Sequence, residues 1–126
     1  MSKHRQIEIL CATMNQTDLS KYQEMNIKNC DAIFANQAGT YAYEEMHEDQ
    51  ISARMLTTAT RGVGKNRNLA LALAAGDILL FADDDVKYES DLSEMIEKAY
   101  RKFPDAEMII FGIQYTKNGD VFQKRL

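Results

Sequence analysis

Three consecutive carboxylates, Asp83-Asp84-Asp85, are the residues of this 126-residue sequence best suited to chemistry. They end an apolar run over residues 78–82, and like charges this close together repel one another unless a cation binds between them. Because side chains alternate along a strand, Asp83 and Asp85 are predicted to point the same way and to bind a metal. Carboxylate oxygens suit Mg²⁺ or Mn²⁺, and Mg²⁺ commonly binds substrate phosphates as well. The alternative is a solvated acidic strand end.

A glycine-led basic segment, residues 61–68 (RGVGKNRN), is the second candidate for chemistry. The free N–H groups at a helix N-terminus bind anions, so Gly62, Lys65 and Arg67 are candidates for phosphate contacts. Neither common phosphate-binding pattern is complete. A P-loop requires Ser or Thr where Asn66 stands, and a dinucleotide-binding turn requires glycine where Arg67 stands. The alternative is a flexible turn with solvated basic side chains.

Apolar runs alternating with helical patterns must position these segments. Strands are predicted over residues 7–12, 32–35, 53–58, 77–82 and 108–113. Continuous apolar strands interleaved with helices are typical of a three-layer α/β/α sandwich, with a mainly parallel sheet covered on both faces. Ligands of such sheets bind beyond the carboxyl ends of the strands. We therefore expect one edge of the sheet to gather residues 13–15, 36–37, 60–65 and 83–85.

Three helices are predicted, one after Thr17-Asp18, one between Gly62 and Gly76, and one between Ser90 and Pro104. The leucines and alanines of the second indicate a largely buried helix, with Gly76 as its C-terminal cap. Residues 41–50 are polar without a clean period, which predicts a loop, and residues 117–120 (KNGD) predict a hairpin turn.

In their order, these motifs resemble the family-2 glycosyltransferases of the GT-A fold. That family has a glycine-led turn with Arg-Asn, then Ala-x-Gly-Asp, then an apolar strand ending in Asp-x-Asp. The matching segments here are residues 62–68 (GVGKNRN), 74–77 (AAGD) and 78–85 (ILLFADDD). Residues 9–15 (ILCATMN) look like the family's first strand, which usually ends in Pro-x-Tyr-Asn. The resemblance covers about residues 6–113 in order.

The resemblance implies a site for a UDP- or GDP-sugar and metal-dependent transfer of the sugar to an acceptor hydroxyl, in polysaccharide or glycoconjugate synthesis. The expected nucleotide-sugar-binding residues are Thr13, Asn15, Asn36, Gln37, Gly62, Lys65, Arg67, Asp83 and Asp84. By analogy, Thr13 and Asn15 lie near the base, and Arg67 near the base or the diphosphate. Asp83 approaches the ribose or the metal, and Asp85 is a metal ligand, so Asp83 and Asp85 are the expected residues of a Mg²⁺ or Mn²⁺ site.

The sequence departs from the family pattern in three places. Met14 stands where the family usually has an aromatic residue, which weakens or removes a stacking contact with the base. Asn36-Gln37 replace an acidic strand end; amides donate as well as accept hydrogen bonds, so the identity of the base stays open. The family's acceptor-side half and catalytic base have no counterpart before Leu126. No catalytic residue is therefore assigned, and we expect residues 1–126 to form a single donor-binding domain with little turnover.

Composition narrows the choice of function. A net charge of −4 and a pI near 5.1 argue against nucleic-acid binding through phosphate neutralisation. Cys11 and Cys30 are expected to be reduced, buried thiols. The longest apolar run, residues 69–75, is far shorter than the ~20 residues of a membrane span. We expect a cytoplasmic chain, with peripheral association at the inner face of a membrane left open.

Two other functions remain open at this level. One is a non-catalytic nucleotide-binding α/β module. The other is a phosphatase-like domain in which Asp83 and Asp85 serve as nucleophile and acid. The second reading is disfavoured because such aspartates usually follow the first strand of a sheet, and here they follow the fourth predicted strand.

Overall fold

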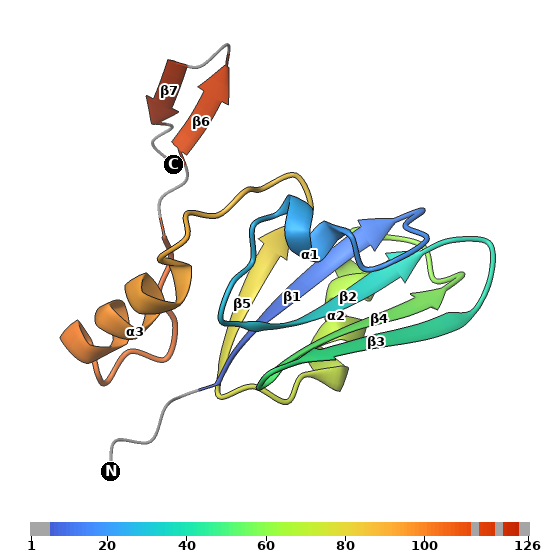
Figure 1. The fold of residues 1–126 in the computed structure, drawn as a ribbon, viewed down its shortest axis with the longest axis horizontal. Helices are drawn as coiled ribbons and strands as arrows, with labels where there is room; N and C mark the ends of the chain where they lie inside the picture. The colour runs from blue at the N-terminus through green and yellow to red at the C-terminus, as the bar shows by residue number, and fades with distance from the viewer. Residues whose placement is uncertain (1–5, 112–113, 118–119, 124–126) are drawn as a thin grey trace. The chain divides into compact units, whose positions relative to one another are not determined.

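Four of the predicted strands pair in parallel and form most of one sheet (Figure 1). The computed structural model describes residues 6–111, 114–117 and 120–123. The strands of the sheet are β1 (Ile7–Met14), β2 (Asp31–Gln37), β3 (Ala42–Glu48), β4 (Ile51–Thr58) and β5 (Ile78–Asp83). Their order is β3-β4-β2-β1-β5, with β3 antiparallel to β4. This confirms the predicted α/β fold with a mainly parallel sheet.

The two faces of the sheet are covered by different segments. Leu10, Ile33 and Ala35 form a buried cluster with Ala70 of helix α2 (Val63–Leu73). The alternate residues of β1 and β2, such as Ile9 and Phe34, are buried on the opposite face. Figure 1 shows the single-turn helix α1 (Lys21–Glu24) on that face, in front of the strands, with α2 behind them. The chain therefore lies on both sides of the sheet, as the apolar strands predict.

Most of residues 41–50 form an edge strand, so the predicted loop is wrong for residues 42–48. Strand β3 pairs with β4 from Ala42↔Thr57 to Glu48↔Ile51. Every residue of β3 is exposed except the half-buried Met46, so the strand needs no apolar alternation. Its stability comes from the backbone pairing with β4, which leaves no signal in side-chain periodicity.

Helix α2 is less buried than its leucines and alanines suggest. Only Asn66 and Ala70 are buried, while Leu69 and Leu73 are partly covered and Leu71 is 44% exposed. A helix packed on one sheet presents a single stripe to it, so the remaining apolar residues face outward. The prediction of a largely buried helix is therefore wrong for most of its residues.

Gly76 is required by close packing and does not cap α2. The helix ends at Leu73, with Ala74 in an extended conformation as its C-cap. A Cβ atom on residue 76 would lie 2.7 Å from the Cβ of Glu8 and 3.1 Å from its backbone nitrogen. The chain can pass this close to β1 only without a side chain.

We expect Gly76→Ala to destabilise the fold by about 1–3 kcal/mol, because the added methyl group must displace backbone atoms of β1. Gly64→Ala is the matched control, since a Cβ there meets no atom within 4 Å. Gly64 lies inside α2, where alanine is favoured over glycine by about 0.5–1 kcal/mol. Urea unfolding of both variants should move the midpoint in opposite directions; an unchanged midpoint for Gly76→Ala would refute the packing argument.

The chain divides into two compact units, residues 1–95 and residues 96–126. Helix α3 (Leu92–Lys102) ends before Pro104, as predicted. Strands β6 (Gln114–Lys117) and β7 (Asp120–Gln123) pair antiparallel with Lys117↔Asp120, as the predicted hairpin requires, and the turn residues 118–119 lie outside the described residues. The strand predicted over residues 108–113 is wrong for residues 108–111, which have no regular structure, and residues 112–113 lie outside the described residues.

The two large apolar side chains of this segment, Met108 and Ile110, are not buried. They are 77% and 80% exposed, so they lack the cover that a buried strand needs.

No helix in the described part of the chain has the length and apolarity needed to span a membrane.

Candidate functional site

The aspartate turn, Asp83-Asp84-Asp85, lies beside the end of β1. Ala12 pairs with Asp83 in the sheet, and the next residue, Thr13, donates its hydroxyl to Asp84 Oδ2 at 2.8 Å. Strand β5 stops at Asp83, and the Val86 N–H donates to the Asp83 carbonyl at 3.4 Å. Because Asp84 and Asp85 are in a turn, strand alternation does not set the direction of Asp85, contrary to the sequence argument.

Two of the three carboxylates of the aspartate turn already have partners. Arg67 Nη2 donates to Asp83 Oδ1 at 2.7 Å, with both side chains well exposed. An exposed pair of this kind contributes about 1 kcal/mol or less, so a ligand can compete for it. Asp84 holds the Thr13 hydroxyl. Asp85 is exposed and makes no hydrogen bond or ion pair with any described residue, so its oxygens are available to a cation.

An open pocket of about 480 Å³ lies on the same side of the sheet as Arg67. It is lined by Gly64, Arg67 and Asn68 of α2 and by Phe81 of β5. Leu79 and Phe81 are 36% and 51% exposed, so α2 leaves this part of β5 uncovered. Helix α2 therefore covers β1 and β2 but not this part of β5.

The loop after β1 is fixed by Asn36, whose side chain is fully buried. Its Oδ1 accepts from the Gln16 N–H at 3.0 Å, and its Nδ2 donates to the Gln16 carbonyl at 2.8 Å and to Thr57 Oγ1 at 3.1 Å. Asn15, with a φ of 56°, donates its N–H to the Gln37 carbonyl at 2.9 Å. Asn36 therefore holds the loop of Asn15 in place, while its own amide is occupied.

The glycine turn before α2 is held from two sides. Gln37 Oε1 accepts from the Gly62 N–H at 3.0 Å, and Asn66 Nδ2 donates to the carbonyls of Thr60 and Gly62 at 2.9 Å each. Gly62 has a φ of 108°, which favours glycine. Lys65 is exposed and has no ion-pair partner among the described residues. Gln37 and Gly62 thus meet at one edge, as predicted, but they bind each other.

Lys21 belongs to this edge and was missed by the sequence analysis. Its Nζ donates to the backbone carbonyl of Asp84 at 3.3 Å, and Glu24 lies 3.5 Å away. The loop between β1 and β2 folds back over the sheet and brings α1 to the aspartate turn. No spacing in the sequence indicates this return, since α1 is a single turn with one lysine.

The buried thiol of Cys11 lies near the charged groups of Asp83, Asp84, Lys21 and Arg67. Burial raises its pKa to about 12, with Asp84 and Asp83 acting in the same direction and Lys21 and Arg67 opposing them. The thiol is therefore protonated at neutral pH and unsuited to act as a nucleophile. Neither Cys11 nor Cys30 is in a disulfide, and both are buried, as predicted.

Side chains around the ends of β1 and β5 suit a hard cation only in part. Within the described ranges, no three His, Cys, Asp or Glu side chains come together in a group that could hold a metal. Mg²⁺ often takes one or two protein carboxylates and completes its shell with water and substrate phosphates. The free Asp85 carboxylate, with Asp83 two residues away, fits such a shared site.

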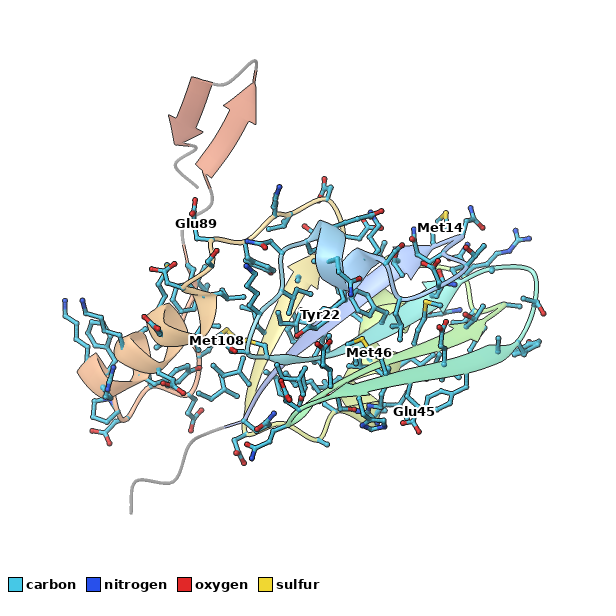
Figure 2. The ribbon with its side chains drawn as sticks, viewed as in Figure 1. Met14, Tyr22, Glu45, Met46, Glu89 and Met108 are labelled. Atoms are coloured by element: carbon cyan, nitrogen blue, oxygen red, sulfur yellow. The ribbon has the colours of Figure 1, made fainter. Side chains whose placement is uncertain are left out.

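Figure 2 shows Met14 at the tip of β1, and its side chain is 52% exposed. An exposed, flexible thioether thus stands at the position where the resemblance implies an aromatic residue. Tyr22, labelled in the same figure, is buried and donates its hydroxyl to the Cys30 carbonyl at 2.8 Å. It anchors the loop that carries α1 and offers no exposed ring in place of the aromatic.

A family model described as Glycosyl transferase family 2 matches residues 10–126. Comparisons with curated proteins and with solved structures found no match. The matched range contains all the expected site residues from Thr13 to Asp85, and the mainly parallel five-stranded sheet agrees with part of a GT-A domain. The chain therefore belongs to glycosyl transferase family 2, and it contains a glycosyltransferase domain of that family.

Proposed function

We propose that the chain binds a nucleoside-diphosphate sugar, with UDP or GDP as the nucleotide, at the carboxyl edge of the sheet. The carboxyl edge is the edge where β1, β2, β4 and β5 end. The observation that supports this most is the meeting of Thr13, Arg67 and the aspartate turn at this edge, inside the family match. Ligands of parallel sheets bind at this position, and the family uses nucleotide-sugar donors.

The residues at this edge divide into two kinds. Asn15, Arg67, Lys65 and Asp85 are exposed and are proposed to contact the donor or the metal. The other residues are already held in hydrogen bonds between loops: Thr13 to Asp84, Asn36 to Gln16, and Gln37 to Gly62. They are proposed to fix the shape of the site. Asp84 belongs with the second kind, because its carboxylate accepts the Thr13 hydroxyl.

Asp83 and Asp85 are proposed to hold Mg²⁺ or Mn²⁺ together with the donor's diphosphate. When bound, the cation neutralises the diphosphate and stabilises it as a leaving group. Arg67 is proposed to stabilise the negative charge of the diphosphate as well, because its guanidinium has N–H donors left after its bond to Asp83. The sugar is then transferred to an acceptor hydroxyl, whose proton must pass to a base, and no described residue is assigned that role.

Calorimetry with UDP-glucose, UDP-N-acetylglucosamine and GDP-mannose tests the proposal. Each donor is titrated into the folded chain in Mn²⁺ and again in EDTA. We expect one nucleotide to bind in Mn²⁺ and to bind at least about tenfold more weakly in EDTA, because the cation offsets charge on both the carboxylates and the diphosphate. A folded sample that binds none of the three donors in saturating Mn²⁺ would overturn the proposal.

A further inference from the structure

The aspartate turn is contacted by one cation from each side of the sheet. Arg67 reaches Asp83 from α2, and Lys21 reaches the Asp84 carbonyl from α1. Figure 1 shows α1 and α2 on opposite faces of the sheet. Both cations, together with Asp83 and Asp84, act on the pKa of the buried Cys11 thiol. All four charged groups therefore lie close to this thiol.

The contacts of Lys21 hold it near the aspartate turn but do not use all of its hydrogen-bond donors. Its side chain is 21% exposed, its bond to the Asp84 carbonyl is long at 3.3 Å, and its Glu24 partner is 60% exposed. An ammonium group has three donors, and a 3.5 Å ion pair with the exposed Glu24 holds it weakly. Lys21 can therefore turn a donor toward an anion at the aspartate turn.

Charge balance at the turn gives Lys21 a role. The turn carries three carboxylates and is contacted by two cations, so an incoming diphosphate meets excess negative charge unless positive groups face it. Arg67 Nη2 lies 2.7 Å from the Asp83 carboxylate, whereas Lys21 Nζ lies 3.5 Å from the Glu24 carboxylate and contacts a neutral carbonyl at the turn. More of the charge of Lys21 is thus left for a ligand.

We propose that Lys21 contacts the donor's diphosphate from the α1 side of the sheet and supplies diphosphate affinity that does not depend on the metal. This inference rests on the proposed function and adds a specific binding residue to it. We expect Lys21 to act on the diphosphate and not on the nucleoside, since its Nζ lies at the aspartate turn.

The test compares Lys21→Met with Lys21→Arg and with Lys28→Met, an exposed lysine of the same loop, as the matched control. Calorimetry measures the affinity of each chain for UDP, GDP, uridine and guanosine, in EDTA and in Mg²⁺. We expect Lys21→Met to weaken binding of the preferred diphosphate roughly tenfold or more in both conditions, because a charge-assisted hydrogen bond is lost. Nucleoside binding should not change, Lys21→Arg should restore most of the affinity, and Lys28→Met should match the wild type.

Different failures identify different errors. If the wild type binds a diphosphate and Lys21→Met binds it equally well, the inference about Lys21 is overturned while the proposed function stands. If Lys21→Met weakens nucleoside and diphosphate equally, Lys21 only holds the turn in place, and the inference is again overturned. If the wild type binds neither nucleotide in Mg²⁺, the proposed function and this inference fall together.

Discussion

Asp85→Ala is expected to abolish the metal dependence of nucleotide-sugar binding while the fold stays intact. The carboxylate is exposed and makes no hydrogen bond or ion pair within the described residues, so its loss should not change stability by more than ~0.5 kcal/mol. Affinity in Mn²⁺ should fall roughly 100-fold, to the value measured in EDTA, because the diphosphate then loses the cation that neutralises it. Calorimetry in Mn²⁺ and in EDTA measures both values.

Asp105→Ala is the control for this substitution, since Asp105 is an exposed aspartate beyond α3. It should leave both affinities at the wild-type value. If Asp85→Ala keeps a large difference between Mn²⁺ and EDTA, Asp85 is not a metal ligand. A loss of affinity in EDTA as well would mean that the substitution damages the site in another way.

Glu8→Ala is expected to destabilise the fold by about 1–3 kcal/mol, which is the range for leaving hydrogen-bond donors without their acceptor. Glu8 is only 3% exposed, and its Oε2 accepts from Arg54 Nη2 at 3.1 Å. Its Oε1 accepts from the N–H groups of Ala75 and Gly76 at 2.7 and 3.2 Å. Arg54 also donates to the Leu73 carbonyl at 2.7 Å, so the pair joins β1 and β4 to the end of α2.

Urea unfolding at pH 7 measures the effect, with two comparisons. Glu8→Gln keeps an acceptor for the Ala75 N–H and loses only the charge, so its loss should be smaller than that of Glu8→Ala. Glu44→Ala removes an exposed glutamate of β3 and should change stability by less than ~0.5 kcal/mol. A loss below ~1 kcal/mol for Glu8→Ala would show that the carboxylate is not needed to hold this corner.

The parallel sheet could be predicted because its inner strands are buried on both faces. Ile9, Ile33 and Phe34 lie in apolar runs that only a covered strand tolerates, and their order along the chain fixes which ends meet. The meeting of Thr13 with the aspartate turn at the carboxyl edge follows from that order. Strand β3 could not be predicted, because backbone pairing holds an exposed edge strand without any side-chain period.

Site residues were harder to predict than the sheet, because their roles depend on hydrogen bonds between distant loops. Asn36 is at the expected strand end, yet its amide is consumed by Gln16 and Thr57. Lys21 reaches the aspartate turn only because the loop after β1 folds back. Gly76 is special for its approach to Glu8, which a sequence cannot distinguish from a helix cap. Periodicity identifies elements, but it does not show which polar atoms are already used.

Paramagnetic broadening by Mn²⁺ tests most directly whether the donor and its metal bind at the carboxyl edge. Amide NMR spectra of the ¹⁵N-labelled chain are recorded with the preferred UDP- or GDP-sugar, with and without a trace of Mn²⁺. The signals of Asn15, Asp83 and Val86 should broaden strongly, whereas those of Glu8 and Gly76, at the opposite ends of β1 and β5, should stay sharp. Equal broadening at both ends of the strands, or broadening confined to Glu8 and Gly76, would contradict the placement of the donor site.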